Sequence, residues 1–255
     1  MVFVSLVATL AWRTPIPAQE KDAPEIVVLD LGGGVKMEFV RIQAGKFTMG
    51  DKDFKNATPH EVTLTKDFWM QTTETTQAQW EAVMGKNPSE LKGADLPVEM
   101  VSWNDCQEFL KKLTERAKEQ WKGKKAGLPT EAEWEYACRA GEKGKWCFGD
   151  DEKKLGEYAW FRDNAEKSTH PVAQKKANAW GLYDMHGNVR EWCKDWYGTY
   201  EKDAGTDPTG PVKGEYCVFR GGSWNSNARG ASSAYRIEMS PAYCDRGGGV
   251  RPVLR

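Results

Sequence analysis

Two short segments of this 255-residue chain combine residue types that usually surround a bound ion or ligand. The first reads Gly181-Leu-Tyr-Asp-Met-His-Gly-Asn-Val-Arg-Glu-Trp192, in which Asp, Asn and Glu lie between glycines and aromatic residues. The second reads Arg220-Gly-Gly-Ser-Trp224 and places two glycines before a Ser-Trp pair. Neither segment has the period of a helix or a strand. Both therefore predict a backbone that is shaped around a ligand or an ion.

The first segment contains the donors that a calcium ion prefers. Hard cations bind carboxylate and carbonyl oxygens presented by a turning chain. Asp184 and Glu191 supply side-chain oxygens, and Gly187 and Val189 supply backbone carbonyls. The spacing is not that of an EF-hand. A calcium loop is one interpretation, and a Gly-Asn turn held by the aromatic residues on either side is the other.

The second segment opens a window rich in arginine. Residues 220–255 contain six Arg, no Lys and two acidic residues, a local excess of four positive charges in a chain of net charge -1. Arginine suits fork-like recognition of carboxylate or sulfate groups and stacks on aromatic rings. The window therefore indicates an anion or peptide groove. The alternative is that these arginines satisfy backbone carbonyls in a domain with little regular structure.

Several common kinds of site are not expected. The three histidines, His60, His170 and His186, are too widely spaced to suggest a His-based zinc or iron triad. Gly221-Gly-Ser-Trp-Asn225 lacks the closing glycine of a nucleophile elbow, and the chain has no P-loop and no dinucleotide-binding glycine motif after a strand. The net charge of -1 gives no electrostatic basis for nucleic-acid binding.

The amino-terminal residues indicate export. Residues 2–12 are apolar but too few for a stable membrane span, which takes about 20 residues. Their length is that of a signal-peptide core, so we expect a signal peptide over 1–18, a linker and leading strand over 19–35, and a single domain over 36–255. The expected location is periplasmic or extracellular, with a cytoplasmic location as the alternative. The expected form is a monomer.

The six cysteines fit three disulfides in an exported protein, and buried free thiols are the alternative. No CxxC pair is present, so a structural zinc site is not expected.

The elements that must hold these segments are short. Strands are predicted at 26–29, 37–42, 47–49 and 60–64, with a glycine turn at 32–34, and the strand at 47–49 is expected to continue the first sheet. Helices are predicted to begin at Thr76, near Asn104 and at Thr130, the first and third with capping boxes to Gln79 and Glu133. Beyond residue 142 no helix is predicted. Twelve Trp and 25 Gly favour a loop-rich domain with aromatic packing.

Three motifs in order resemble the formylglycine-generating enzyme (sulfatase-modifying factor) family. They are Leu128-Pro-Thr-Glu-Ala-Glu-Trp-Glu-Tyr-Ala137, the Gly181–Trp192 segment and Arg220-Gly-Gly-Ser-Trp224, with weaker upstream blocks such as Pro97-Val-Glu-Met-Val-Ser-Trp103. The resemblance covers about residues 36–253. It implies an α+β domain with the C-type-lectin-like fold and little regular secondary structure. It also implies that Asp184, Gly187, Val189 and Glu191 hold a structural Ca²⁺.

The enzymes of this family oxidise a cysteine of a sulfatase peptide to formylglycine with O₂, using two cysteines that bind copper(I). By resemblance these two positions are Ser226 and Ala231 here, so copper is not expected as a cofactor. Arg190 stands where the family usually has an active-site tryptophan, whereas Ser223 is retained.

We therefore expect a non-oxidase member, a pseudo-enzyme that binds a peptide, a protein or a small anionic ligand on its C-terminal surface. The candidate ligand-binding residues are Arg190, Ser223, Trp224, Asn225, Ser226, Arg229 and Arg236. The alternatives are a formylglycine-generating oxidase with altered chemistry, or another oxidase on the same scaffold.

Overall fold

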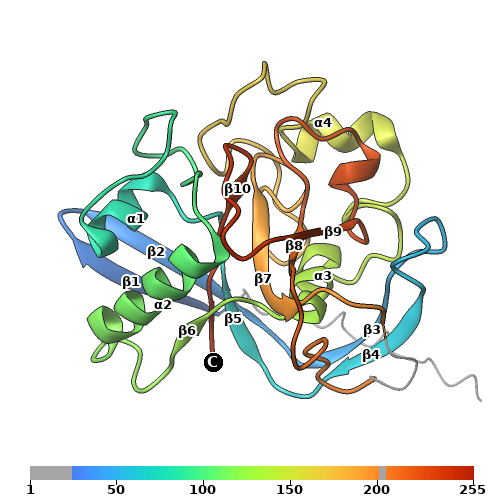
Figure 1. Ribbon diagram of the computed structural model, residues 1–255, viewed down its shortest axis with the longest axis horizontal. Coiled ribbons are helices and arrows are strands. Elements are labelled where there is room, and N and C mark those ends of the chain that lie inside the picture. The colour runs from blue at the N-terminus through green and yellow to red at the C-terminus, as the bar shows by residue number, and fades with distance from the viewer. Residues whose placement is uncertain (1–24, 201–204) are drawn as a thin grey trace, which may run out of the picture.

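A computed structural model describes residues 25–200 and 205–255, and the proposed signal peptide at 1–18 lies outside these residues. The first half of the chain forms β1 (Ile26–Gly32), β2 (Val35–Ile42), β3 (Gly45–Met49), β4 (His60–Leu64), β5 (Phe68–Gln71), α1 (Gln77–Met84), α2 (Trp103–Ala117), β6 (Ala126–Gly127) and α3 (Glu131–Arg139). The second half forms α4 (Leu155–Tyr158), β7 (Arg190–Trp196), β8 (Cys217–Arg220), β9 (Arg236–Met239), β10 (Gly248–Gly249) and β11 (Val253–Leu254), with short 3₁₀ turns at 152–154 and 229–231. Many long connections separate short elements, as the α+β expectation requires (Figure 1).

The amino- and carboxyl-terminal parts of the chain share one sheet. Its strand order is β1-β2-β5-β11-β6, so the last strand lies between two strands from the first half of the chain. β1 pairs along β2 and turns through three glycines with positive φ, Gly32, Gly33 and Gly34. Leu29 and Leu31 of β1 are buried, so residues before 36 already belong to the packed domain. β3 and β4 form a separate two-stranded sheet, which corrects the prediction that 47–49 continue the first one.

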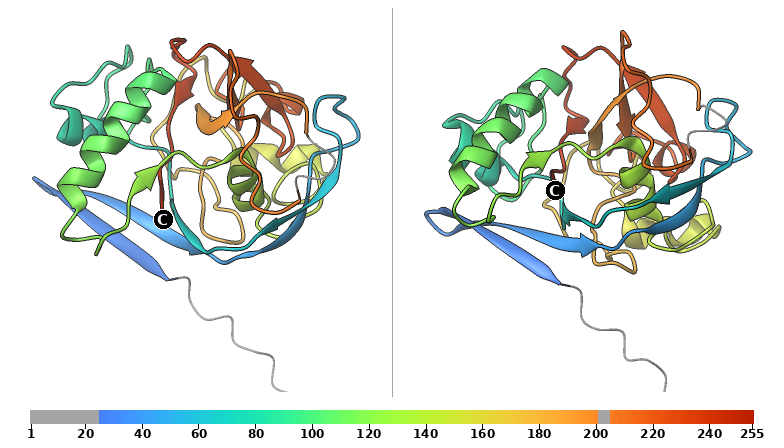
Figure 2. Two further views of the ribbon diagram at one scale, coloured as in Figure 1. Left: turned by 60° about the horizontal axis from the view of Figure 1, so that its bottom comes forward. Right: turned by 90° about the horizontal axis from the view of Figure 1, so that it is seen from below.

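The three predicted helices are present where their caps indicated. Thr76 and Thr130 accept hydrogen bonds from the backbone at Gln79 and Glu133, and both capping boxes are complete. α2 begins at Trp103 with Ser102 as its cap, one residue before the predicted start. α1 and α2 pack at the end of the molecule that holds β1 and β2 (Figures 1 and 2).

The region beyond residue 142 contains more regular structure than predicted. The short helix α4 follows a 3₁₀ turn, and a second sheet has the strand order β10-β7-β8-β9. β7 carries the end of the first motif, and β8 ends at Arg220, where the second motif begins. The second sheet therefore brings the two motifs side by side. Within the described ranges, no helix has the length and apolar character needed to cross a membrane.

All six cysteines are free thiols in this structure, so the alternative to disulfides holds here. Four of them are buried, Cys147 is half-buried and Cys244 is exposed.

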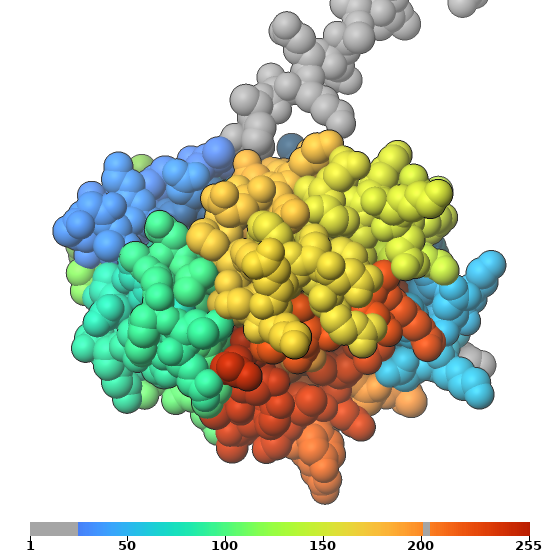
Figure 3. All heavy atoms as spheres, turned by 90° about the horizontal axis from the view of Figure 1, so that it is seen from above, coloured from blue at the N-terminus to red at the C-terminus, as the bar shows by residue number. Residues whose placement is uncertain are grey.

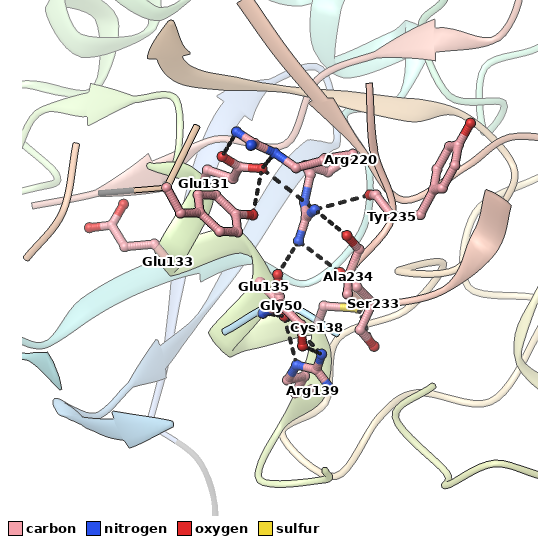
Figure 4. Close-up of polar contacts among 12 residues, drawn as sticks. Gly50, Glu131, Glu133, Glu135, Cys138, Arg139, Arg220, Ser233, Ala234 and Tyr235 are labelled. Carbon is pink, nitrogen blue, oxygen red and sulfur yellow. Dashed lines mark hydrogen bonds and ion pairs between the residues drawn. The ribbon is translucent and has the colours of Figure 1, made fainter. Parts of the chain in front are cut away.

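Helix α3 carries a buried ionic network that ties the second sheet to the rest of the domain (Figure 4). The guanidinium of Arg220 contacts the carboxylate of Glu135 and donates to the carbonyls of Ser233, Ala234 and Tyr235 at 2.8–3.1 Å. Arg139 donates to the other oxygen of Glu135 at 2.9 Å. Buried charges are tolerated only when they are paired and hydrogen-bonded, which these are.

Truncating Glu135 should lower the free energy of unfolding far more than truncating one member of an exposed ion pair with the same helical spacing. Glu135→Ala leaves the buried Arg220 and Arg139 without their shared carboxylate, and should lower the free energy of unfolding by about 3–5 kcal/mol. The control is Glu108→Ala, which breaks the exposed i,i+4 pair with Lys112 and should change stability little. Urea unfolding of both variants tests this, and equal effects would contradict it.

Candidate functional site

The Gly221-Gly222 pair makes a close backbone crossing that holds the second motif. Both residues have positive φ, 92° and 71°. A Cβ on Gly222 would lie 2.7 Å from the carbonyl oxygen of Gly230 and 2.9 Å from Cα of Ala231. Only glycine fits this crossing, which places the Ser-Trp pair beside the turn at 229–231.

The two positions that the resemblance assigns to copper ligands, Ser226 and Ala231, have structural contacts here. Ser226 accepts a hydrogen bond from the backbone of Ser223 at 3.0 Å through its Oγ and donates its own backbone N–H to the carbonyl of Ser223 at 2.8 Å. Ala231 is fully buried, and its carbonyl lies 2.9 Å from Nδ1 of His186. Between Trp224 and Arg255 the sequence has a single thiol, the exposed Cys244.

The buried ring of His186 fixes the backbone at Ala231 through a hydrogen bond. Its Nε2 accepts from the backbone N–H of Cys147 at 3.0 Å, so Nδ1 carries the proton that is donated to Ala231. Burial lowers the pKa of His186 to about 4, which keeps the ring neutral at physiological pH. The histidine of the first motif therefore supports the loop of the second.

Four candidate ligand-binding residues lie together, of which Arg190, Trp224 and Asn225 reach the surface and Ser223 is buried. Oδ1 of Asn225 accepts from Oγ of Ser223 at 2.7 Å and from the guanidinium of Arg190 at 3.2 Å. Trp224 is half-exposed, and its indole N–H donates to the carbonyl of Arg246 at 2.9 Å. We call these residues, with Arg246, the 190/224 surface.

The 190/224 surface has charges of both signs. Arg190 lies 3.6 Å from Asp245. Arg246 lies 3.5 Å from Glu90 and packs 5.8 Å from the ring centre of Trp224. Figure 3 shows this C-terminal chain, in red, against the blue-green chain around residue 90 and the yellow chain that precedes the first motif. The C-terminal part of this surface therefore borders two earlier parts of the chain.

The remaining candidates lie elsewhere. Arg236 is buried against Glu131, with two hydrogen bonds at 2.6–2.7 Å, and does not face the 190/224 surface. Arg229 is exposed but packs on Phe54 and donates to the carbonyl of Asp53. Arg220, Arg236 and Arg251, half of the arginines in the window, are buried and bonded to carbonyls and carboxylates. The alternative interpretation of the window therefore holds for these three.

The two acidic residues among the expected calcium ligands, Asp184 and Glu191, differ in whether their oxygens are already hydrogen-bonded. Asp184 is buried with φ of 61°, its Oδ2 accepts from Ala173 at 2.7 Å, and its Oδ1 is buried without a hydrogen-bond partner among the described residues. Burial raises the pKa of Asp184 to about 6. An orphaned carboxylate oxygen fits a hard cation. A Cβ on Gly187 would lie 2.2 Å from the carbonyl oxygen of Trp160, so this glycine serves a close crossing.

Glu191 fits a cation less well. Its two oxygens accept from the guanidinium of Arg251 at 2.7–3.0 Å and from the indole of Trp134 at 2.6 Å. These bonds use the lone pairs that a metal would need. Across the described residues, no group of three or more His, Cys, Asp or Glu side chains is arranged to hold a metal ion.

Two charged residues of this region were not among the sequence candidates. Glu74 is fully buried and accepts from the backbone of Val189 and from the side chain of Asn188, at 2.9 and 2.7 Å. Burial, with Asp184 and Glu191 nearby, raises the pKa of Glu74 well above its ordinary value. The buried guanidinium of Arg251, which forms a salt bridge with Glu191, lowers the pKa of Glu74 in part. In the sequence, Glu74 lies in a polar stretch of threonine and glutamine that gives no sign of burial, whereas Arg251 follows a glycine-rich stretch.

Two glycine substitutions should separate backbone strain from a clash in the second motif. Gly181→Ala places a side chain in open space at φ of 82°, so it carries strain alone and should cost about 1–2 kcal/mol. Gly222→Ala has similar strain but also meets the 230–231 backbone, and should cost about 1–3 kcal/mol more. Chemical unfolding of both variants measures the difference. Equal losses would mean that the loop is not packed as described.

The comparisons with known proteins agree with this arrangement. A family model described as the sulfatase-modifying factor enzyme 1-like domain matches residues 34–255. The chain is 30% identical over 246 residues to the chaperone protein LppX of Paenibacillus barcinonensis, covering 79% of this chain and 83% of that protein. It is 36% identical over 161 residues to the formylglycine-generating enzyme of Streptomyces coelicolor, covering 58% of this chain but only 48% of that enzyme.

Solved structures support the same fold. Treponema denticola variable protein 1 matches with a TM-score of 0.86 and 31% identity over 91% of this chain and 100% of that one. PvdO from Pseudomonas aeruginosa matches with a TM-score of 0.77 and 26% identity over 90% and 98% of the two chains. The expected C-type-lectin-like α+β fold is confirmed. The chain belongs to the sulfatase-modifying factor, or formylglycine-generating enzyme, family.

Proposed function

We propose that this protein is a non-oxidase member of the family that binds a peptide or protein segment on the 190/224 surface. One observation carries the proposal: the two family copper positions are Ser226, bonded to the Ser223 backbone, and Ala231, which is buried. Copper(I) requires soft ligands such as thiolates. A hydroxyl that is already bonded and a methyl group supply none.

The charge pattern favours a peptide over a simple anion. Asp245 beside Arg190 and Glu90 beside Arg246 would repel a free anion from both guanidinium groups. A peptide can place charges of both signs, and its apolar side chains can pack on Trp224. Tryptophan and arginine are the residues that most often carry binding energy at protein interfaces. The chaperone name of LppX, which matches most of this chain, also supports a protein ligand.

Selection from a random peptide library displayed on phage tests the proposal with the full chain. Selected peptides should lose at least about tenfold in affinity for Trp224→Ala, because this removes the central aromatic contact. The matched control is Tyr216→Ala, an aromatic side chain that is 45% exposed at the opposite end of β8. Binding that is equally strong in Trp224→Ala would place the ligand elsewhere, and an unenriched library would contradict the proposal.

We also propose a structural Ca²⁺ that uses Asp184, with the carbonyls of Gly187 and Val189 as further donors. The support is the buried, unpartnered Oδ1 of Asp184. A cation there would offset the charge of this carboxylate without disturbing the Glu191–Arg251 pair.

Removal of calcium should lower the melting temperature by several degrees, since each kcal/mol corresponds to about 2–4 °C in a chain of this size. Asp184→Asn should abolish the response to chelator, whereas Asp163→Asn, an exposed carboxylate on a neighbouring loop, should keep it. Glu191→Ala is a poor test because it leaves Arg251 buried and unpaired. A melting temperature that ignores both chelator and added calcium would reject this site.

A further inference from the structure

A separate cavity of about 250 Å³ lies at the amino-terminal end of α3, away from the 190/224 surface. It lies between α3, the end of β7, β9 and the chain at 207–211. Its lining includes His60, Glu131, Asp195, Tyr200 and Arg236.

One of the two buried acids in this cavity is already neutralised. Glu131 forms two hydrogen bonds with Arg236 and accepts another from the hydroxyl of Tyr200 at 3.2 Å. Arg236 also donates to the carbonyls of Asn56 and Gly198. This pair is complete and leaves no charge for a ligand.

The other acid, Asp195, has one carboxylate oxygen that accepts no hydrogen bond from the described residues. Asp195 is only 4% exposed, and its Oδ2 accepts from the backbone N–H of Glu131 at 2.9 Å. Its Oδ1 accepts no hydrogen bond from the described residues. Oδ1 lies 3.2 Å from the place where a Cβ on Gly210 would be, and Gly210 also lines the cavity. The free oxygen is thus on the cavity side, where glycine leaves room beside it.

The rest of the lining suits a cation. Asp207 also lines the cavity, and its Oδ1 accepts from the backbone N–H of Thr65 at 2.7 Å. The lining therefore has three acidic residues, Glu131, Asp195 and Asp207, and a single arginine. His60 and Tyr200 of the lining have their rings 4.7 Å apart, whereas the ring of Trp196 stacks on that of Trp103. Aromatic faces beside a carboxylate attract an organic cation. Arg236 shows the same preference, with its guanidinium 4.2 Å from the ring centre of Tyr200.

We propose that this cavity binds a primary alkylammonium group, with Asp195 as its counter-ion and the rings of His60 and Tyr200 beside its alkyl chain. The volume lies just below the range of about 300–1,000 Å³ that is typical of drug-sized ligands, so the ligand is a small amine or the end of a lysine side chain. The inference is independent of the peptide surface proposed above.

The proposal predicts how binding depends on pH. Burial, together with the carboxylates of Glu131 and Glu133, raises the pKa of Asp195 to about 8, although the Glu131 N–H and Lys194 act in the opposite direction. Arg236, Asp207, His60 and Tyr200 are the other charged or titratable groups in the lining. An alkylammonium keeps its proton up to about pH 10 and binds the ionised carboxylate. Affinity should therefore rise about tenfold for each pH unit up to pH 8, with release of a proton at lower pH.

Isothermal titration calorimetry of the full chain with n-butylamine, between about pH 6 and pH 9, tests the proposal. A capped peptide with one lysine is titrated in parallel. Tighter binding of n-butylamine would identify a free amine as the ligand, and tighter binding of the peptide would identify a lysine side chain. Repeating the wild-type titration in buffers of different ionisation enthalpy measures the released proton without any variant.

Asp195→Asn keeps an acceptor for the Glu131 N–H but removes the charge, and should weaken binding at least tenfold at about pH 8. The control is Glu238→Gln, which makes the same charge change at an exposed position of β9 outside the cavity. It should bind like the wild type. Absence of binding to the wild type, or affinity that does not change with pH and with Asp195→Asn, would overturn the proposal and leave Asp195 as a cap of α3 only.

Discussion

The buried guanidinium of Arg220 contacts the buried carboxylate of Glu135 in α3 and donates to three consecutive carbonyls at 233–235. Arg220 precedes the glycine pair, and the three carbonyls follow the turn at 229–231. A single side chain therefore joins both ends of the loop that contains Ser226 and Ala231. Burial alone would lower the pKa of Arg220, but the carboxylates of Glu135 and Glu131 hold it above its ordinary value. This ion pair therefore fixes the shape of the loop.

A second buried pair does the same for the first motif. Arg251 near the carboxyl terminus holds both oxygens of Glu191 in β7, and the indole of Trp134 in α3 completes the contact. Glu74 then fixes the turn at 188–189 from the opposite side. Both motifs of this family are thus held by charge pairs within the protein.

Local signals in the sequence predicted the local parts of the fold. The capping boxes at Thr76 and Thr130 identified α1 and α3, because both partners of each box lie within four residues. β8 and β9 were not predicted, since strands of four residues in a glycine-rich stretch have no clear period. The site was predicted in part. Ser223, Trp224 and Asn225 meet because they are neighbours in sequence, whereas the pairing of Arg236 with Glu131 joins residues 105 positions apart.

The central claim is that an intact family scaffold surrounds a site without copper chemistry. Its most direct test is incubation of the purified protein with copper(I), O₂ and a peptide that contains Cys-x-Pro-x-Arg, followed by mass spectrometry of the peptide. The account predicts a peptide of unchanged mass, because the resemblance assigns the copper positions to Ser226 and Ala231, which have no thiol. Conversion of the peptide cysteine to formylglycine, read as the corresponding loss of mass, would contradict it.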